Sequence, residues 1–236
     1  MRLDKFLCEM NIGSRSQVKA YLKQGLVTVN EMVVQTPEQK LDEYRDVVSF
    51  RGQVLSYQQY HYYMLNKPGG VITATKDRVA ATVMDLLPAD IRKKLFPVGR
   101  LDKDTEGLLL LTDDGELAHR LLSPTKHVDK TYLVQVARPL SSQDCRTLEA
   151  GVDIGEEKLT APAVAELLQE CQLLLTIQEG KFHQVKRMLQ AVGNEVTALK
   201  RVRFAGLTLD ETLKPGEYRE LTDREVRSLH EADAKG

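Results

Sequence analysis

A charged loop that runs directly into four consecutive leucines constrains this chain more than any other feature. The loop is RLDKDTEG at 100–107, the leucines are Leu108–Leu111, and a DDG turn follows at 113–115. The segment GLLLLT predicts a strand, and four adjacent leucines must be buried. The loop is therefore held at the rim of a core, where an acidic side chain can be positioned rigidly enough for chemistry.

Asp102 and Asp104 are the candidate acids of this loop, next to Arg100 and Lys103. An isolated pair of this kind is most often a solvated turn in which Asp104 caps a neighbouring backbone. Paired aspartates can also hold Mg²⁺ in phosphoryl enzymes of the haloacid-dehalogenase type. In that motif the apolar strand precedes the acids and Thr or Val stands in place of Glu106, so this interpretation is weak. The remaining interpretation is a single catalytic carboxylate, acting without metal beside a basic RNA-binding face.

Short apolar runs alternate with amphipathic segments along the rest of the chain. Strands are predicted at 62–67, 107–112, 130–137, 162–168, 171–178 and 195–204, and helices at 116–122, 183–193 and 221–232. Thr222 is expected to cap the last helix. Strands outnumber helices and neighbouring strands look antiparallel, so we expect an α+β fold.

Two short helices and a hairpin are predicted near the start of the chain. The first helix has one apolar face, formed by Leu3, Phe6, Leu7 and Met10. Ser14 caps the second helix with Gln17 as its capping-box partner, and Gly25 ends it. The hairpin is LVTVNEMVV with its turn at Asn30-Glu31, and DVVSFRG forms a further strand.

Basic side chains are unevenly distributed, although the chain has 33 basic against 34 acidic residues. Arg15, Lys19 and Lys23 recur every four residues and form one stripe on the second helix, which taken alone is most often a solvated face. Residues 181–203 hold six basic residues and one acidic residue, whereas residues 140–175 hold two and seven. Such a chain can present a basic face to phosphate while its net charge stays near zero.

Composition excludes several classes of protein. No apolar run approaches the roughly 20 residues that span a bilayer, and the charged start MRLDKFLCEM is unlike a secretory signal. Cys8, Cys145 and Cys171 lie too far apart for a CxxC pair or a disulfide framework, which fits a reducing cytoplasm. The five histidines lack metal-ligand spacing. We expect no metal, no other cofactor and no membrane partner.

Two further segments could belong to a nucleic-acid site. Lys186 and Arg187 project from the first turns of the helix at 183–193, beside Phe182 and His183. Aromatic and cationic side chains together are typical of nucleic-acid sites, although a plain basic helix face is also common. Tyr132 lies inside a strand, where core packing is more frequent than stacking on a base, and spacing does not decide between them.

Together these segments resemble the pseudouridine synthase family, in its ribosomal small subunit synthase A branch. GRLDKDTEGLLLLTDDG resembles the aspartate motif, KTYLV the tyrosine motif and EGKFHQVKRM the basic motif, while MLNKPGGVI at 64–72 resembles the opening strand. Order and spacing agree through residues 62–220. The first 55 or so residues, including SRSQVKAYLKQGLVTVN, resemble the small RNA-binding domain named after ribosomal protein S4.

The resemblance implies a role for each motif. Asp102 is the catalytic aspartate, Tyr132 stacks on the target uracil, and Lys186 pairs with Asp102. Arg100 enters the RNA stack that the extruded base leaves. Further contacts with RNA are expected from the stripe and from the basic motif, at Arg15, Lys19, Lys23 and Arg187.

The resemblance also implies the organisation and activity of the chain. An RNA-binding domain is expected at 1–58 and a mainly antiparallel, mixed-sheet catalytic domain at 59–236, joined by a linker near 58–60. The implied reaction isomerises uridine to pseudouridine in ribosomal RNA without a cofactor. The short C-terminal segment favours uridine 516 of 16S rRNA, in a partly assembled small subunit. A 23S rRNA target and a non-catalytic assembly factor are the alternatives, and a cytoplasmic monomer is expected.

Overall fold

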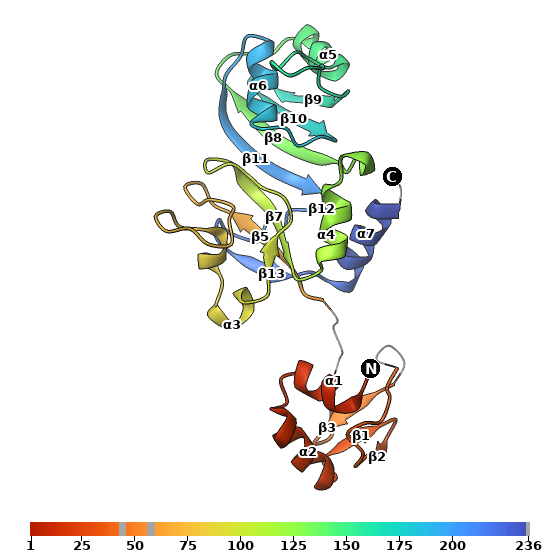
Figure 1. Ribbon diagram of the computed structural model, residues 1–236. Coiled ribbons are helices and arrows are strands. Elements are labelled where there is room, and N and C mark those ends of the chain that lie inside the picture. Colours follow the sequence, from red (N-terminus) through yellow and green to blue (C-terminus); the bar gives the residue numbers. More distant parts are fainter. Residues whose placement is uncertain (43–45, 56–59, 235–236) are drawn as a thin grey trace. The chain divides into compact units, whose positions relative to one another are not determined.

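The chain divides into two compact units, Met1–Gln59 and Tyr60–Gly236. A computed structural model describes residues 1–42, 46–55 and 60–234 of the chain (Figure 1). The boundary expected between residues 58 and 59 lies outside the described residues. No helix in these described ranges is long and apolar enough to cross a bilayer.

The N-terminal unit packs two helices and a four-stranded antiparallel sheet around one core. The helices are α1 (Leu3–Glu9) and α2 (Arg15–Lys23). The sheet has the order β2-β1-β3-β4. Its strands are β1 (Val27–Val29), β2 (Met32–Val33), β3 (Val48–Phe50) and β4 (Gln53–Leu55). The shared core consists of Leu3, Phe6, Leu7, Val18, Leu22, Val27, Val29, Val34, Leu41 and Val48.

Most local predictions for this unit are confirmed. Ser14 and Gln17 form the expected capping box, and Gly25 follows α2 with a φ of +70°. Asn30 and Glu31 both have positive φ, as the tight turn between β1 and β2 requires. The segment 53–55 forms an additional strand, β4, that was not predicted. Backbone pairing with β3 holds this exposed edge strand, so its polar sequence carried no strand signal.

The C-terminal unit contains a large mixed sheet and several helices. Its path of seven strands is β13-β5-β7-β11-β8-β10-β9, with β6 paired to β7 and β12 paired to β11. The strands are β5 (Tyr62–Lys67), β6 (Phe96–Pro97), β7 (Glu106–Thr112), β8 (Lys130–Val136), β9 (Val164–Gln169), β10 (Gln172–Ile177), β11 (Val196–Phe204), β12 (Leu207–Thr208) and β13 (Tyr218–Glu220). The helices are η1 (Val83–Leu86), α3 (Ala89–Arg92), α4 (Gly115–Leu122), η2 (Pro124–Lys126), α5 (Ser142–Ala150), α6 (Gln184–Ala191) and α7 (Asp223–Ala234).

The fold is α+β, as expected, and the strand pairs of this sheet are antiparallel except for one. The parallel pair joins β7 and β11, which connects the β13-β5-β7 half of the sheet to the β8-β10-β9 half. Figure 1 shows α5 and α6 beside the half that contains β8, β9 and β10, while α4 and α7 lie beside β12. The parallel pair could not be predicted from the sequence, because its two strands lie about 90 residues apart.

The four leucines of β7 are all fully buried, as predicted. Leu109 and Leu111 belong to one core with α5 and α6, whereas Leu108 and Leu110 belong to a second core with α4 and α7. Side chains alternate between the faces of a strand, so β7 is buried on both faces and anchors both cores. The loop that carries Asp102 leads directly into this fixed strand.

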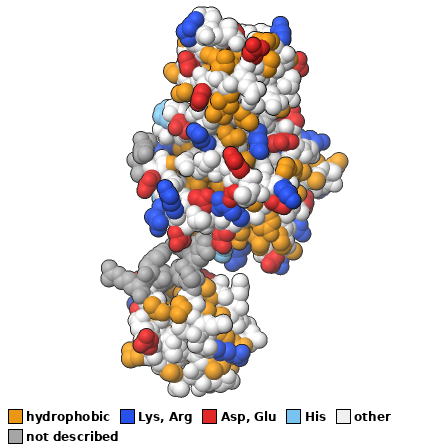
Figure 2. Space-filling model, turned by 180° about the vertical axis from the view of Figure 1, so that it is seen from behind, with side chains coloured by type: hydrophobic (Ala, Val, Ile, Leu, Met, Phe, Trp, Pro, Cys, Tyr) orange, Lys and Arg blue, Asp and Glu red, His pale blue; other side chains and the backbone are white. Residues whose placement is uncertain are grey.

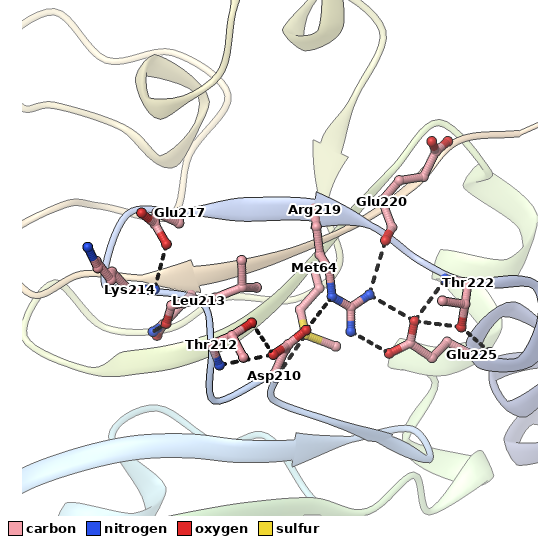
Figure 3. Close-up of polar contacts among 11 residues, drawn as sticks. Met64, Asp210, Thr212, Leu213, Lys214, Glu217, Arg219, Glu220, Thr222 and Glu225 are labelled. Carbon is pink, nitrogen blue, oxygen red and sulfur yellow. Dashed lines mark hydrogen bonds and ion pairs between the residues drawn. The ribbon is translucent and has the colours of Figure 1, made fainter.

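A charged network fastens α7 to the sheet (Figure 3). Arg219 of β13 donates to Asp210 at 2.6 Å and to both carboxylate oxygens of Glu225, in the first turn of α7, at 2.8 and 2.9 Å. Arg219 holds the pKa of Glu225 at about 2. Thr222 and Glu225 exchange capping hydrogen bonds, which confirms the predicted cap.

Candidate active site

A cavity of about 770 Å³ opens in the C-terminal unit beside the aspartate loop. The 99–105 loop, β8, β10, β11 and the residues around the start of α6 form its wall. The predicted site residues Arg100, Asp102 and Tyr132 all line it, together with Lys130, Lys181, His183 and Arg201. The fold therefore brings the aspartate and tyrosine motifs to one hollow, although 30 residues separate them in the sequence.

The aspartate loop is fastened on both sides of Asp102. The Thr73 hydroxyl donates to the Leu101 carbonyl at 2.8 Å and accepts from the Leu101 amide at 3.1 Å. The ammonium of Lys67, at the end of β5, donates to the carbonyls of Lys103 at 3.3 Å and Thr105 at 2.8 Å. These contacts position Asp102 without touching its carboxylate.

Lys67 is a buried cation that sequence reasoning missed. Its residue is 0% exposed, and burial lowers its pKa to about 8, although nearby carboxylates partly offset this effect. A lysine at the end of an apolar strand, in NKPGG, was the available signal. Its ammonium donates to three backbone carbonyls, those of Pro68, Lys103 and Thr105.

Replacing Lys67 should loosen the loop and change how stability depends on pH. We expect Lys67→Met to lower any turnover at Asp102 by about 100-fold, because small misplacements of a reacting group have effects of this size. Between the folded pKa of about 8 and the unfolded value of 10.5, the unfolded chain binds the extra proton, so the free energy of unfolding rises with pH.

Urea unfolding of the wild type and Lys67→Met across this pH range tests the second effect. Burial also lowers the pKa of Lys130 to about 8. Lys67→Met should therefore reduce the slope between pH about 8 and about 10, and Lys130→Met serves as the matched variant. An unchanged slope in Lys67→Met would show that Lys67 is not a buried ammonium.

A histidine and a lysine approach Asp102 from the start of α6. His183 Nε2 lies 3.6 Å and Lys186 Nζ 3.7 Å from Asp102 Oδ2. Lys186 forms an ion pair with Asp102, as the resemblance implied, while its hydrogen bonds go to Asp104, at 2.6 and 2.8 Å. This ammonium holds the pKa of Asp104 below its usual value. Lys186 thus lies between the two acids, bound to the more exposed one.

Tyr132 lies in β8, directly opposite Arg201 of β11. The tyrosine is 8% exposed and contributes both to the core and to the cavity wall, so its sequence alternatives are not exclusive. Arg201 is 2% exposed, and its Nε donates to the Leu108 carbonyl at 2.9 Å. A tyrosine face and a buried guanidinium therefore form adjacent parts of one wall.

Comparison with known proteins now decides the family. The family model for RNA pseudouridylate synthase matches residues 61–191, and the S4 domain model matches residues 1–45. The chain belongs to the RNA pseudouridylate synthase family. Its fold, with an S4 domain before a mixed-sheet synthase domain, is the one the sequence predicted.

Several relatives match the synthase over nearly its whole length. It is 48% identical to a Bacillus subtilis protein described as uncharacterized RNA pseudouridine synthase YtzG, covering 99% of this chain and 100% of that one. It is 44% identical to ribosomal small subunit pseudouridine synthase A of Escherichia coli (strain K12), covering 97% and 100%. A crystal structure of a pseudouridylate synthase, 39% identical, superposes with a TM-score of 0.70 over 97% of this chain and 99% of that one.

The other predicted contact residues of the synthase have different surroundings. Arg100 is exposed at the cavity wall. Arg187 binds Glu156 at 2.8 Å, the Phe182 carbonyl at 3.0 Å and the Ile154 carbonyl, so its donors serve contacts within the protein. A role for Arg187 in RNA binding stays a prediction.

Two more residues of the synthase cavity were missed at the level of sequence. Lys181 lines the wall with its Nζ 3.4 Å from Glu179, although it lies within the recognised segment EGKFHQVKRM. Arg201 was counted only as part of a basic segment. A buried basic residue inside an apolar strand gives a weak signal, because the sequence does not show which face of the strand it occupies.

The structure gives no support to the magnesium interpretation. In the part of the chain that the structure describes, no group of three or more His, Cys, Asp or Glu side chains is placed to hold a metal ion. Asp104 instead forms an ion pair with Lys186.

Proposed function

We propose that this synthase converts uridine to pseudouridine in ribosomal RNA with Asp102 as its catalytic carboxylate. The observation that carries the proposal is the position of Asp102. The loop that holds it is anchored by Lys67 and Thr73, and it lines a cavity whose wall also contains Tyr132. The Lys186 ammonium, 3.7 Å from Asp102 Oδ2, places a positive charge beside this carboxylate.

The reaction exchanges a C1′–N1 bond for a C1′–C5 bond, so the uracil must detach, turn and reattach within one site. The Asp102 carboxylate can attack C1′, as in retaining glycosidases, or remove the C2′ proton to give a glycal. Both routes begin with the same ionised group. A cavity of about 770 Å³ can hold a whole nucleotide while the base turns.

The target nucleotide must leave its stack to reach this cavity. The face of Tyr132 can hold the flipped uracil by stacking, worth about 1–3 kcal/mol per base. Arg100, exposed at the cavity wall, can occupy the gap that the base leaves. Phe182 is 74% exposed and stacks on His183 at 3.8 Å, which adds an aromatic surface beside Asp102.

The substrate we propose is 16S rRNA, at uridine 516, within a partly assembled small subunit. Relatives 44% identical over nearly the whole chain, from Vibrio cholerae and Escherichia coli, are named ribosomal small subunit pseudouridine synthase A. These names support a small-subunit target over 23S rRNA. We also propose a monomer in the cytoplasm, in keeping with three free cysteines.

Tritium release from RNA labelled at uracil C5 tests the reaction, because the C5 hydrogen leaves whenever C1′–C5 forms. Purified protein is incubated with labelled 16S and 23S rRNA, free and in assembly intermediates, with and without EDTA. Release that survives EDTA, followed by mapping of the product, identifies the uridine. Absence of release from every RNA would favour a non-catalytic assembly factor.

The basic stripe of α2 is proposed to bind RNA phosphates. Arg15, Lys19 and Lys23 are exposed, while Val18 and Leu22 of the same helix are buried in the core. On the face of the molecule in Figure 2, by contrast, Lys and Arg side chains of the C-terminal unit lie intermixed with Asp and Glu. A stripe of one sign is the better site for a polyanion.

Charge reversal at Lys19 and Lys23 should weaken RNA binding and flatten its salt dependence. Each phosphate contact contributes about 0.7–0.9 to the slope of log K against log salt, so losing two contacts should reduce the slope by roughly 1.5. Filter binding over a salt series measures it, with reversal of Lys158, on the exposed 155–158 turn, as the control. An unchanged salt dependence would show that the stripe is a solvated face that does not bind RNA phosphates.

A further inference from the structure

Two buried polar atoms in the cavity wall lack hydrogen-bond partners. Among the described residues, three buried side-chain atoms have no hydrogen-bond partner, namely Asn66 Oδ1, Thr105 Oγ1 and Arg201 Nη2. Thr105 and Arg201, each 2% exposed, both line the cavity beside Asp102. Buried donors are almost always paired in native proteins, so two unpaired ones in one wall indicate that a ligand completes them.

The register of the sheet places Arg201 next to the start of β7, which directly follows Thr105. Arg201 of β11 pairs with Gly107 of β7 on one side and with Tyr132 of β8 on the other. Thr105 lies in the loop directly before β7 and lines the same cavity as Arg201. Gly107 itself has no side chain, which lets the Arg201 backbone approach closely, because an added Cβ would lie 2.3 Å from the Arg201 carbonyl oxygen.

Arg201 is also a buried cation without a carboxylate. None of the described ion pairs involves it, and its guanidinium lies over the Phe204 ring, 4.8 Å from the ring centroid. Burial lowers its pKa, while the neighbouring Tyr132 favours the charged form. A lone buried charge is costly to folding. Its position in the wall of a catalytic cavity is consistent with a charge that balances one carried by the substrate.

We infer that Arg201, aided by the Thr105 hydroxyl, forms a subsite for a carbonyl oxygen of the target uracil and stabilises the negative charge of the detached base. The inference rests on the proposed function. It adds a catalytic residue that contacts the base, whereas Asp102 acts on the sugar.

The charge balance of the reaction supports this assignment. When C1′–N1 breaks, its electron pair remains on the uracil, which becomes an anion with charge shared over N1, O2 and O4. Asp102 loses its own charge by bonding C1′ or by taking the C2′ proton. The negative charge therefore moves from the carboxylate to the base, toward Arg201. When C5 then bonds C1′, the C1′–O bond to Asp102 breaks, or on the glycal route Asp102 returns its proton to C2′, and the carboxylate is restored. The C5 proton leaves to water while N1 takes up a proton, so the product base is neutral.

Substitutions at the subsite should separate activity from stability. Removing one donor to a developing negative charge lowers kcat by about 10²- to 10³-fold, which we expect for Arg201→Met in the tritium-release assay. Arg201→Lys, which keeps the charge, should retain at least ten times more activity than Arg201→Met. Thr105→Val should lose activity without a lower melting temperature, because its hydroxyl makes no bond in the free protein. Arg227→Met, on exposed α7, is the control.

Thio-substituted RNA tests the contact itself. Sulfur accepts hydrogen bonds poorly, so substrates with 2-thiouridine or 4-thiouridine at the target should slow the wild type at the position that Arg201 contacts. That penalty should disappear in Arg201→Met, since the donor is already absent. Equal penalties in the wild type and Arg201→Met at both positions would overturn the inference, as would wild-type kcat in a folded Arg201→Met. A wild type without release on any RNA would overturn the proposed function first.

If Arg201→Met does not fold, Arg201→Lys and Thr105→Val carry the same comparison. In Arg201→Lys an ammonium replaces the guanidinium at a different position, so the slowing caused by the thio substitution should still be smaller than in the wild type. Thr105→Val should still lower kcat. Full activity in both variants would overturn the inference.

Discussion

Asp102→Asn should lower turnover on rRNA by about 10⁴-fold or more, with RNA affinity changed by only a few-fold. The amide has the shape of the carboxylate, but it can neither attack C1′ nor accept a proton from C2′. Loss of a group that forms or breaks covalent bonds has effects of this order. Single-turnover tritium release and filter binding on the same RNA measure the two quantities separately.

Asp104→Asn is the matched control for this prediction. Its side chain is 71% exposed and lies in the same loop, where it binds Lys186 rather than the cavity. We expect at most about a ten-fold loss, through a shift of Lys186. Equal losses of turnover in the two variants would favour a pair of metal-binding acids. Normal turnover in Asp102→Asn would refute the assignment of Asp102 as the catalytic carboxylate.

Gly107→Ala should be the most destabilising single substitution at the site. Gly107 has a φ of +98°, and a Cβ there would lie 2.3 Å from the Arg201 carbonyl oxygen. Backbone strain and a clash with backbone atoms each contribute about 1–3 kcal/mol, so we expect a total of about 3–5 kcal/mol. Relief of the clash requires β7 and β11 to separate at their parallel pair.

Thermal unfolding measures this effect directly. For a unit of this size, each kcal/mol corresponds to about 2–4 °C, so the melting temperature should fall by roughly 10 °C or more. Gly115→Ala, a few residues later, is the control, because nothing lies within 4 Å of its added Cβ and it begins α4. A Gly107→Ala protein as stable as Gly115→Ala would mean that the strands are not packed this closely.

Local features were predicted well where short-range chemistry decides them. The Ser14 capping box forms between two residues three positions apart, and the Asn30-Glu31 turn involves two adjacent residues. The burial of the β7 leucines follows from their apolar side chains. The edge strand β4 escaped prediction, because backbone pairing with β3 alone defines it.

The site was predicted in its residues more than in its contacts. Asp102, Tyr132 and Arg100 line one cavity, as the motifs suggested. Lys186 reached Asp102 only to 3.7 Å, because Asp104 offers a closer and more exposed partner. Sequence spacing cannot rank two acids that lie two residues apart.

The sequence by itself determined the order of elements, the buried strand, the motifs and the family that they indicate, since each depends on neighbouring residues or on a recognisable pattern. Only the tertiary structure decided that Lys67 holds the aspartate loop and that Arg201 Nη2 lies without a hydrogen-bond partner in the cavity wall. Both depend on the pairing of β5, β7, β11 and β8. The burial of these side chains and their hydrogen-bond partners depend on how the strands pair, which cannot be read from any single segment of the sequence.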